Sequence, residues 1–180
     1  MLTTIIIFVC SLVSCNNEQQ DIEFKEFLDC EIQIPNTDMF TMNRMVYSRK
    51  AIMLVKFFDE GSCRDCVLKE IALNDLYNID SCSDVGWLYI FETPSDNVKR
   101  FYNQVLDAGI RGVVYLDTCK AFVKANPKFP SNKLFHTFVI NDEGKVLMVG
   151  NPFANEKMEA LFKKVIAKER KKHKEIKKSV

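Results

Sequence analysis

The chain has 180 residues, of which 47% are hydrophobic and 27% are charged, and its formal net charge is +1 at pH 7. This length predicts one globular domain with a substantial core and is too short for two domains of ordinary size. The small net charge argues against a dedicated nucleic-acid binder, so we expect no nucleic-acid partner. Positive charge is concentrated in residues 168–178, where seven Lys and Arg against two Glu give +5 and leave −4 for the other residues.

The N-terminus carries the pattern of an export signal. Residues 2–14 are apolar and uncharged and end in small residues, and they are fewer than the roughly 20 residues of a transmembrane helix. The stretch Leu12-Val13-Ser14-Cys15 is similar to the lipobox of bacterial lipoproteins, in which the cysteine is lipidated before cleavage. We therefore expect a signal peptide over 1–14, a membrane anchor through lipid on Cys15 and a tether over 15–30; a buried N-terminal strand is the alternative. Because Asn16 rather than Asp follows the cysteine, the pattern favours an outer-membrane lipoprotein that faces the periplasm.

Strand and helix patterns alternate through a domain expected at 31–167. The run 51–58 is apolar enough for a central strand that is covered on both faces, and Asp142-Glu143-Gly144 marks a hairpin turn. We predict strands at 31–35, 51–58, 85–93, 112–117 and two within 136–152, and helices at 38–50, 63–78, 96–109, 118–127 and from residue 155. After residue 166 the last helix loses its apolar stripe, so we expect residues 168–180 to form a basic tail that projects into solvent.

Two cysteines, Cys63 and Cys66, begin the helix that follows the apolar strand. In an oxidising compartment such a pair can cycle between dithiol and disulfide, remain a structural bridge or bind a metal ion, and the spacing alone does not decide between these uses. The N–H groups and dipole of the helix N-terminus, together with Arg64, favour a thiolate at Cys63, which makes it the nucleophile. Cys66 lies one turn further on and is the resolving thiol. We interpret the remaining cysteines of the mature chain as structural, namely Cys30, Cys82 and Cys119.

The order of the elements and two segments resemble the thioredoxin fold of membrane-tethered TlpA/ResA-type proteins. Residues 112–125 (GVVYLDTCKAFVKA) and 137–150 (TFVINDEGKVLMVG) are similar to segments of that family, and residues 96–117 match its insertion. The resemblance covers about residues 34–166 and implies an α/β, thioredoxin-like fold with a mixed central sheet flanked by helices and an extra α-β insertion. It also implies a thiol–disulfide oxidoreductase that uses Cys63 and Cys66 without a cofactor. Such a protein acts on envelope proteins with thiols or disulfides and is recharged by a membrane reductase.

Three positions depart from the family pattern. Ser62 stands where the family has Trp, Lys56 is nearest to the place of its buried acid, and Phe135 falls at its cis-proline, where we expect a trans peptide. These departures support a second hypothesis, a non-catalytic thioredoxin-like binding module in which the cysteines form a fixed bridge. A third hypothesis starts from His136, which this alignment places close to the sulfurs. Two thiolates and an imidazole suit soft metals, so the candidate ligands for Cu or Zn are Cys63, Cys66 and His136.

Overall fold

The computed structural model describes residues 18–28, 30–35, 39–41, 50–77, 85–110 and 112–178. The predictions for residues 1–17 lie outside this part of the chain, including the signal peptide and the lipid on Cys15. Cys82 and most of the helix expected at 38–50 lie outside it as well. Within the described ranges, no helix is long and apolar enough to cross a membrane.

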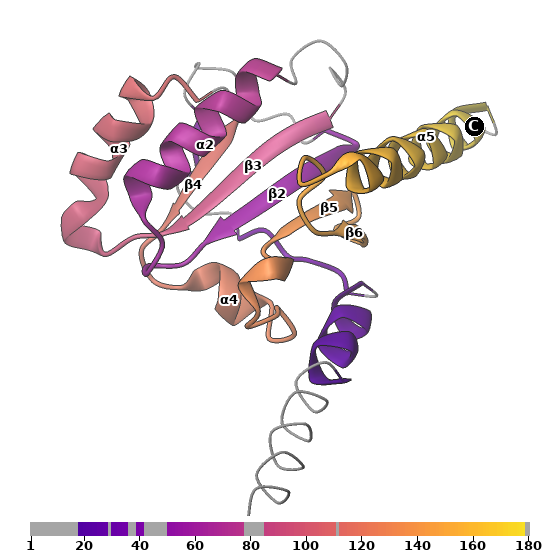
Figure 1. Cartoon of the computed structure of the whole chain (residues 1–180), viewed down its shortest axis with the longest axis horizontal. Helices are drawn as coiled ribbons and strands as arrows, with labels where there is room; N and C mark the ends of the chain where they lie inside the picture. The colour runs from indigo at the N-terminus through magenta and orange to yellow at the C-terminus, as the bar shows by residue number, and fades with distance from the viewer. Residues whose placement is uncertain are drawn as a thin grey trace, which may run out of the picture.

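A six-stranded mixed sheet forms the centre of the molecule, with the strand order β1-β4-β3-β2-β5-β6 (Figure 1). The inner strands β2, β3 and β4 run parallel, whereas β1, β5 and β6 each pair antiparallel with a neighbour. This arrangement confirms the predicted mixed sheet, with parallel crossovers in the middle and a hairpin at the end. The strands are β1 (Met39–Thr41), β2 (Ile52–Phe58), β3 (Val85–Glu92), β4 (Val113–Asp117), β5 (Thr137–Asn141) and β6 (Val146–Val149).

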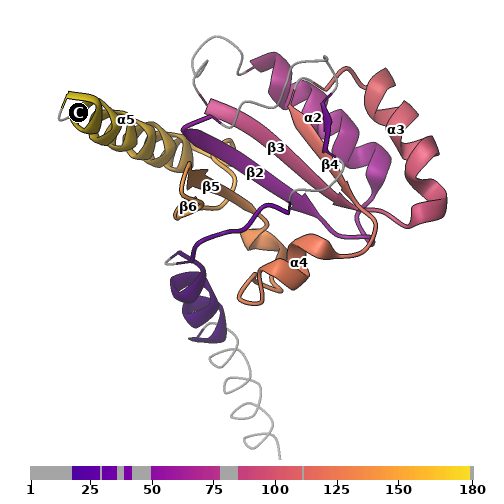
Figure 2. The same ribbon diagram turned by 180° about the vertical axis from the view of Figure 1, so that it is seen from behind.

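Helices cover both faces of the sheet (Figures 1 and 2). Helices α2, α3 and α5 pack on one face, while α4 and the helical residues 18–28 contribute to the core on the other. Helix α3 and strand β4 form the predicted α-β insertion. The helices are α2 (Arg64–Tyr77), α3 (Val98–Asp107), α4 (Ala121–Ala125) and α5 (Glu156–Lys178), with short 3-10 helices η1 (Ser95–Asn97) and η2 (Lys133–Phe135).

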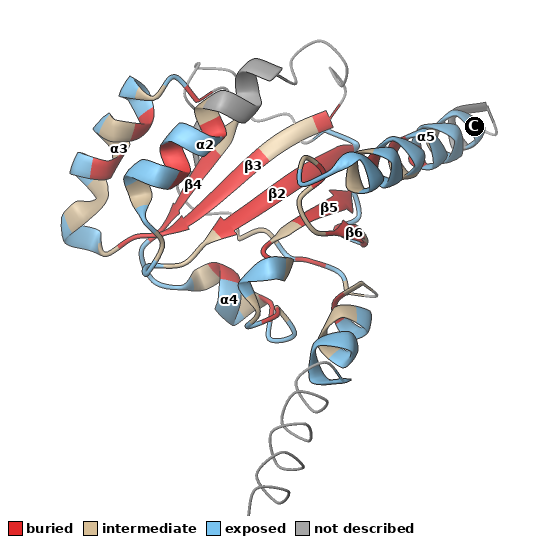
Figure 3. Ribbon diagram, viewed as in Figure 1, coloured by how far each residue is buried: buried red, intermediate tan, exposed pale blue. Residues whose placement is uncertain are grey.

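Strand β2 lies between β3 and β5 and is buried on both sides, as its apolar sequence predicts. Successive side chains enter opposite layers of the core: Met53 and Val55 join the layer that contains Phe122 of α4, and Ile52 and Leu54 join the layer under α5. Figure 3 shows the central strands mostly in red, as buried, with exposed stretches in pale blue on the helices around them. The end of this rigid strand at Phe58 fixes where the following loop and the cysteine pair begin.

The N-terminal part differs from the sequence prediction in three places. Residues 39–41 form a strand that pairs with β4, rather than the start of a helix, because long-range pairing outweighs local helical spacing. The strand expected at 31–35 is reduced to an isolated bridge between Glu31 and Lys145. Phe27 is fully buried in the core, so packed structure begins before residue 31.

Helix α5 continues without a break past residue 167 and still contacts the domain. Its packed side changes from the apolar Phe162 and Ile166 to Glu169, which is 6% exposed, and to His173. Asn141 donates a hydrogen bond of 3.5 Å to the Glu169 carboxylate, and His173 lies 3.7 Å from the Asp142 carboxylate. The expectation that packing stops after residue 166 is therefore wrong at Glu169 and His173, where polar contacts with the β5–β6 turn replace the apolar ones. The other described side chains from residue 168 to residue 175 are exposed.

Candidate active site

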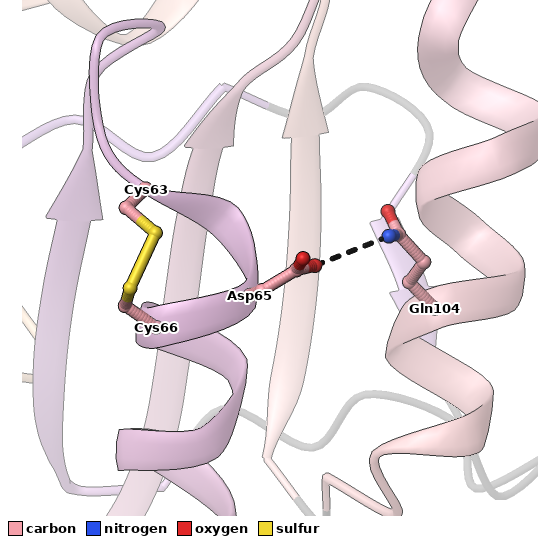
Figure 4. The surroundings of a disulfide bond; sticks show 4 residues. All are labelled: Cys63, Asp65, Cys66 and Gln104. Carbon is pink, nitrogen blue, oxygen red and sulfur yellow. Dashed lines mark hydrogen bonds between the residues drawn. A yellow bond between two sulfur atoms is a disulfide. The ribbon is translucent and has the colours of Figure 1, made fainter.

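The cysteine pair lies at the start of α2, directly after the loop that follows β2. The Cys63 carbonyl accepts the first helical hydrogen bond, from the Val67 N–H at 3.0 Å, so Cys63 caps the helix and Cys66 sits in its first turn. The two sulfurs form a disulfide with a Cα–Cα distance of 5.4 Å, and both residues are exposed (Figure 4). The structure therefore confirms that these two cysteines are close enough to bond and reachable from solvent.

The first turn of α2 is held by α3, the helix of the insertion. The Gln104 amide donates a hydrogen bond of 3.3 Å to the Asp65 carboxylate, and the Arg64 guanidinium lies 5.3 Å from the centre of the Phe101 ring. Figure 4 shows the disulfide on one side of α2 and Asp65 on the other. The acidic side chain between the cysteines is thus turned away from the sulfurs. An open cavity of about 320 Å³ beside Cys63 is lined by Arg64, Arg100 and Gln104 among others.

The loop between β2 and α2 is tied at both ends. Ser62 donates two hydrogen bonds to Asp59, from its hydroxyl to the carboxylate at 2.8 Å and from its N–H to the carbonyl at 3.1 Å. Lys133 of η2 forms an ion pair with Asp59, and the hydrogen bond from Lys133 holds the pKa of Asp59 below its usual value despite partial burial. Ser62 therefore closes a turn in this loop, where the resembling family carries a tryptophan.

A buried carboxyl group supports the same loop from the neighbouring strand. Glu92, at the end of β3, accepts a hydrogen bond from the Glu60 N–H, and burial raises its pKa while Lys120 at 3.9 Å opposes that rise. This contact links the β2–α2 loop to the C-terminal end of β3, an inner strand of the sheet.

His136 does not join the cysteines. Its Nε2 donates a hydrogen bond to the Pro130 carbonyl at 3.0 Å, and its ring stacks on Phe129 and meets the edge of Phe57. Burial in this aromatic cluster lowers the pKa of His136. Among the described residues, no group of three His, Cys, Asp or Glu side chains is placed to hold a metal ion. The structure therefore does not bring Cys63, Cys66 and His136 together as a ligand set, because the imidazole packs in the core and bonds the Pro130 carbonyl.

The residues around Phe135, which the resemblance aligns with a cis-proline, differ from that pattern. Every described peptide bond is trans, including those that flank Phe135. Phe135 packs against the core with Phe24, while Leu134 before it is 72% exposed. The position aligned with the proline thus holds an aromatic side chain that packs on the core, and the residue before it exposes an aliphatic side chain to solvent.

Sequence reasoning missed one feature of the site, an ion pair beneath α2. Lys56 of β2 is 3% exposed, and its Nζ donates a hydrogen bond of 2.8 Å to the Glu70 carboxylate. The sequence signal was a single lysine inside an apolar strand, with Glu70 one helical turn after Cys66. Because an ammonium group is rarely buried without a partner, this pattern predicts a nearby carboxylate.

The other described cysteines lie away from the pair. The Cys30 thiol donates a hydrogen bond of 3.1 Å to the Glu26 carbonyl, and Cys119 is exposed at the end of β4, where its N–H donates to Asp117. Among the residues that the structure describes, the only disulfide joins Cys63 to Cys66.

The architecture matches solved structures at low sequence identity. The solution structure of a thioredoxin-like protein in the oxidised form superposes with a TM-score of 0.52 and 12% identity, over 78% of this chain and 97% of that one. The chain has a thioredoxin-like fold. An uncharacterised thioredoxin-like protein from Porphyromonas gingivalis is similar at a TM-score of 0.49 and 19% identity, over 76% and 92% of the two chains. No family model and no curated protein matches the sequence.

Proposed function

We propose that this protein is a thiol–disulfide oxidoreductase that uses Cys63 and Cys66. The observation that carries this proposal is an exposed disulfide at the N-terminus of the helix that follows the central strand of a thioredoxin-like fold. At this position helix N–H groups and the helix dipole stabilise a thiolate, which is the form of cysteine that attacks disulfides.

The reaction needs no group beyond the two sulfurs. A substrate thiolate attacks Sγ of Cys63, the Cys63–Cys66 bond breaks, and Cys66 leaves as a thiolate. A second thiolate of the substrate then attacks the substrate sulfur of the mixed disulfide, and Cys63 leaves as a thiolate. The substrate now carries the disulfide, and two electrons have passed from the substrate to the protein. In the opposite direction Cys63 attacks a substrate disulfide, and Cys66 resolves the mixed disulfide.

The setting we propose is the cell envelope. A signal peptide over 1–14 and a lipid on Cys15 would anchor the domain at the outer membrane, facing the periplasm, where its partners would be envelope proteins that carry thiols or disulfides. Support comes from the lipobox-like sequence before Cys15 and from the apolar stretch over 2–14. Labelling of intact cells with a lipid precursor tests this point: Cys15→Ala should abolish the label, whereas labelling that persists in this variant excludes Cys15 as the anchor.

The activity is tested with purified protein that lacks residues 1–15. We expect exchange with a glutathione buffer, loss of turnover in Cys63→Ser, and accumulation of mixed disulfides in Cys66→Ser. Cys119→Ser is the matched control, because this exposed cysteine is not part of the pair and its loss should leave exchange unchanged. Absence of exchange in the unsubstituted protein would contradict the proposal.

A second candidate function is a non-catalytic binding module in which the disulfide is permanent. The trans peptides around Phe135 and the Ser62–Asp59 turn favour it, because they replace the proline and tryptophan of the resembling family. The two functions separate in one experiment, since a permanent bridge stays oxidised in buffers that reduce an active pair.

A further inference from the structure

The buried Lys56 is the feature of the site that the exchange reaction does not explain. It is 3% exposed in the middle of the sheet, whereas its partner Glu70 has a side chain that is 51% exposed. Taking an ammonium group out of water is costly, and a half-exposed carboxylate recovers only part of that cost. An apolar side chain of similar size could fill this place in the core without loss of folding stability. The charge of Lys56 therefore calls for an explanation.

The position of the pair relative to the disulfide gives that explanation. Cys63, Cys66 and Glu70 are spaced by three and four residues, so they share one side of α2. Figure 4 shows the disulfide on the side of α2 opposite to Asp65. Lys56 bonds Glu70 on the disulfide side, one helical turn from Cys66. The spacing on α2 therefore places the Glu70 carboxylate, and with it the ammonium group of Lys56, on the helix side that carries Cys66, the sulfur that becomes charged.

We propose that Lys56 stabilises the thiolate at Cys66 when the disulfide opens, and that Glu70 is the counter-ion of Lys56 while the disulfide is closed. This inference rests on the proposed function and adds to it the group that sets the balance between the two redox states. Lys56 is a positioning residue in this scheme, because it acts on the sulfur through its charge and exchanges no atoms with substrate.

The charge balance in the step is explicit. When a substrate thiolate attacks Cys63, one negative charge moves from the substrate to Sγ of Cys66, and no proton is transferred. The ammonium group of Lys56 favours this charge, and the Glu70 carboxylate opposes it. The other charges on the first turn of α2 are engaged elsewhere: Asp65 bonds Gln104, and Arg64 packs over Phe101. Removing the charge of Lys56 and removing the charge of Glu70 should therefore have opposite effects on the stability of the protein whose disulfide has opened.

These opposite signs distinguish the proposal from a purely structural ion pair. If the pair only fastened α2 to the sheet, removing either partner would act on stability and would leave the redox equilibrium alone. If the ion pair controls the stability of the Cys66 thiolate, Glu70→Gln favours the reduced protein and Lys56→Met disfavours it. Glu70→Gln retains an acceptor for Lys56 on a half-exposed site, so this variant keeps the test open even if Lys56→Met does not fold.

The experiment measures the equilibrium constant with glutathione and the pH profile of thiolate absorbance in the reduced protein. We expect Glu70→Gln to shift the equilibrium by about tenfold toward the dithiol and Lys56→Met to shift it by a similar factor the other way, the size expected of a partly screened charge within one helical turn. Lys56→Arg should give the native value, and Lys157→Met on the exposed surface of α5 is the matched charge control, because it removes a lysine charge from a different helix. Shifts of the same sign in Glu70→Gln and Lys56→Met, or no shift in Glu70→Gln, would overturn the proposal. A native protein that does not exchange with glutathione at all would instead remove the proposed function.

Discussion

The clearest stability prediction concerns Asp117, which anchors the start of α4. This residue ends β4 and is 1% exposed. Its carboxylate accepts hydrogen bonds from three backbone N–H groups, those of Ala121 and Phe122 at 2.8 Å and that of Cys119 at 3.2 Å. The carboxylate thereby satisfies the donors that α4 leaves free at its N-terminus and fixes Phe122, a fully buried side chain of the core.

The expected cost follows from these bonds. A hydrogen bond to a charged group contributes roughly 1.5–3 kcal/mol, and each buried N–H that loses its partner costs about 1–3 kcal/mol, so with non-additivity we expect Asp117→Ala to lose about 3–5 kcal/mol. Asp117→Asn keeps one acceptor oxygen but turns an amide N–H₂ toward a donor, and it should lose about 1–3 kcal/mol. Asp107→Ala on the exposed end of α3 is the matched control and should stay within about 0.5 kcal/mol.

Urea unfolding followed by circular dichroism measures these free energies of unfolding. The predicted order of stability is Asp107→Ala, then Asp117→Asn, then Asp117→Ala. A loss below about 1 kcal/mol in Asp117→Ala would show that the three hydrogen bonds to Asp117 do not hold α4 in place.

Two further predictions concern pH and the basic helix. Burial holds the pKa of His136 below its usual 6.5, so below that pH the unfolded chain binds more protons than the folded chain. The free energy of unfolding should therefore fall as the pH drops below about 6.5, and this dependence should weaken in His136→Phe. Urea unfolding at pH 7.5 and 5.5 measures both effects. A pH dependence equal in the two proteins would contradict this. The exposed lysines after residue 167 should give weak binding to anionic vesicles that vanishes at physiological salt and on removal of residues 168–180. Equal binding with and without these residues would rule out a role for them at membranes.

The sequence predicted the parts of the fold that depend on local pattern. The apolar run of β2, the helix begun by Cys63 and the turn at Gly144 all lie where they were expected, because periodicity and turn chemistry are encoded within a few neighbouring residues. Gly144 adopts φ +92°, and a Cβ there would come within 2.5 Å of the Ile32 carbonyl oxygen, so the glycine is required.

Features that depend on distant residues were not predictable. The strand at residues 39–41 exists through its pairing with β4, more than 70 residues away in the chain. The direction of the His136 ring is set by Pro130 and Phe129, which an alignment of motifs does not place. The lysine within the apolar run of β2 indicates a nearby carboxylate, but the identity of that carboxylate, Glu70, depends on how the strand and the helix pack together.

A redox titration decides whether Cys63 and Cys66 form an exchangeable pair. Protein lacking residues 1–15 is equilibrated in buffers of graded potential, and the fraction of free thiols at the two positions is measured by alkylation and mass spectrometry, with Cys63→Ser as the blank. We expect a reversible two-electron transition at a potential between about −120 and −270 mV, the range of exchanging dithiols. A bridge that stays closed below about −300 mV would contradict it and identify the disulfide as a structural bond.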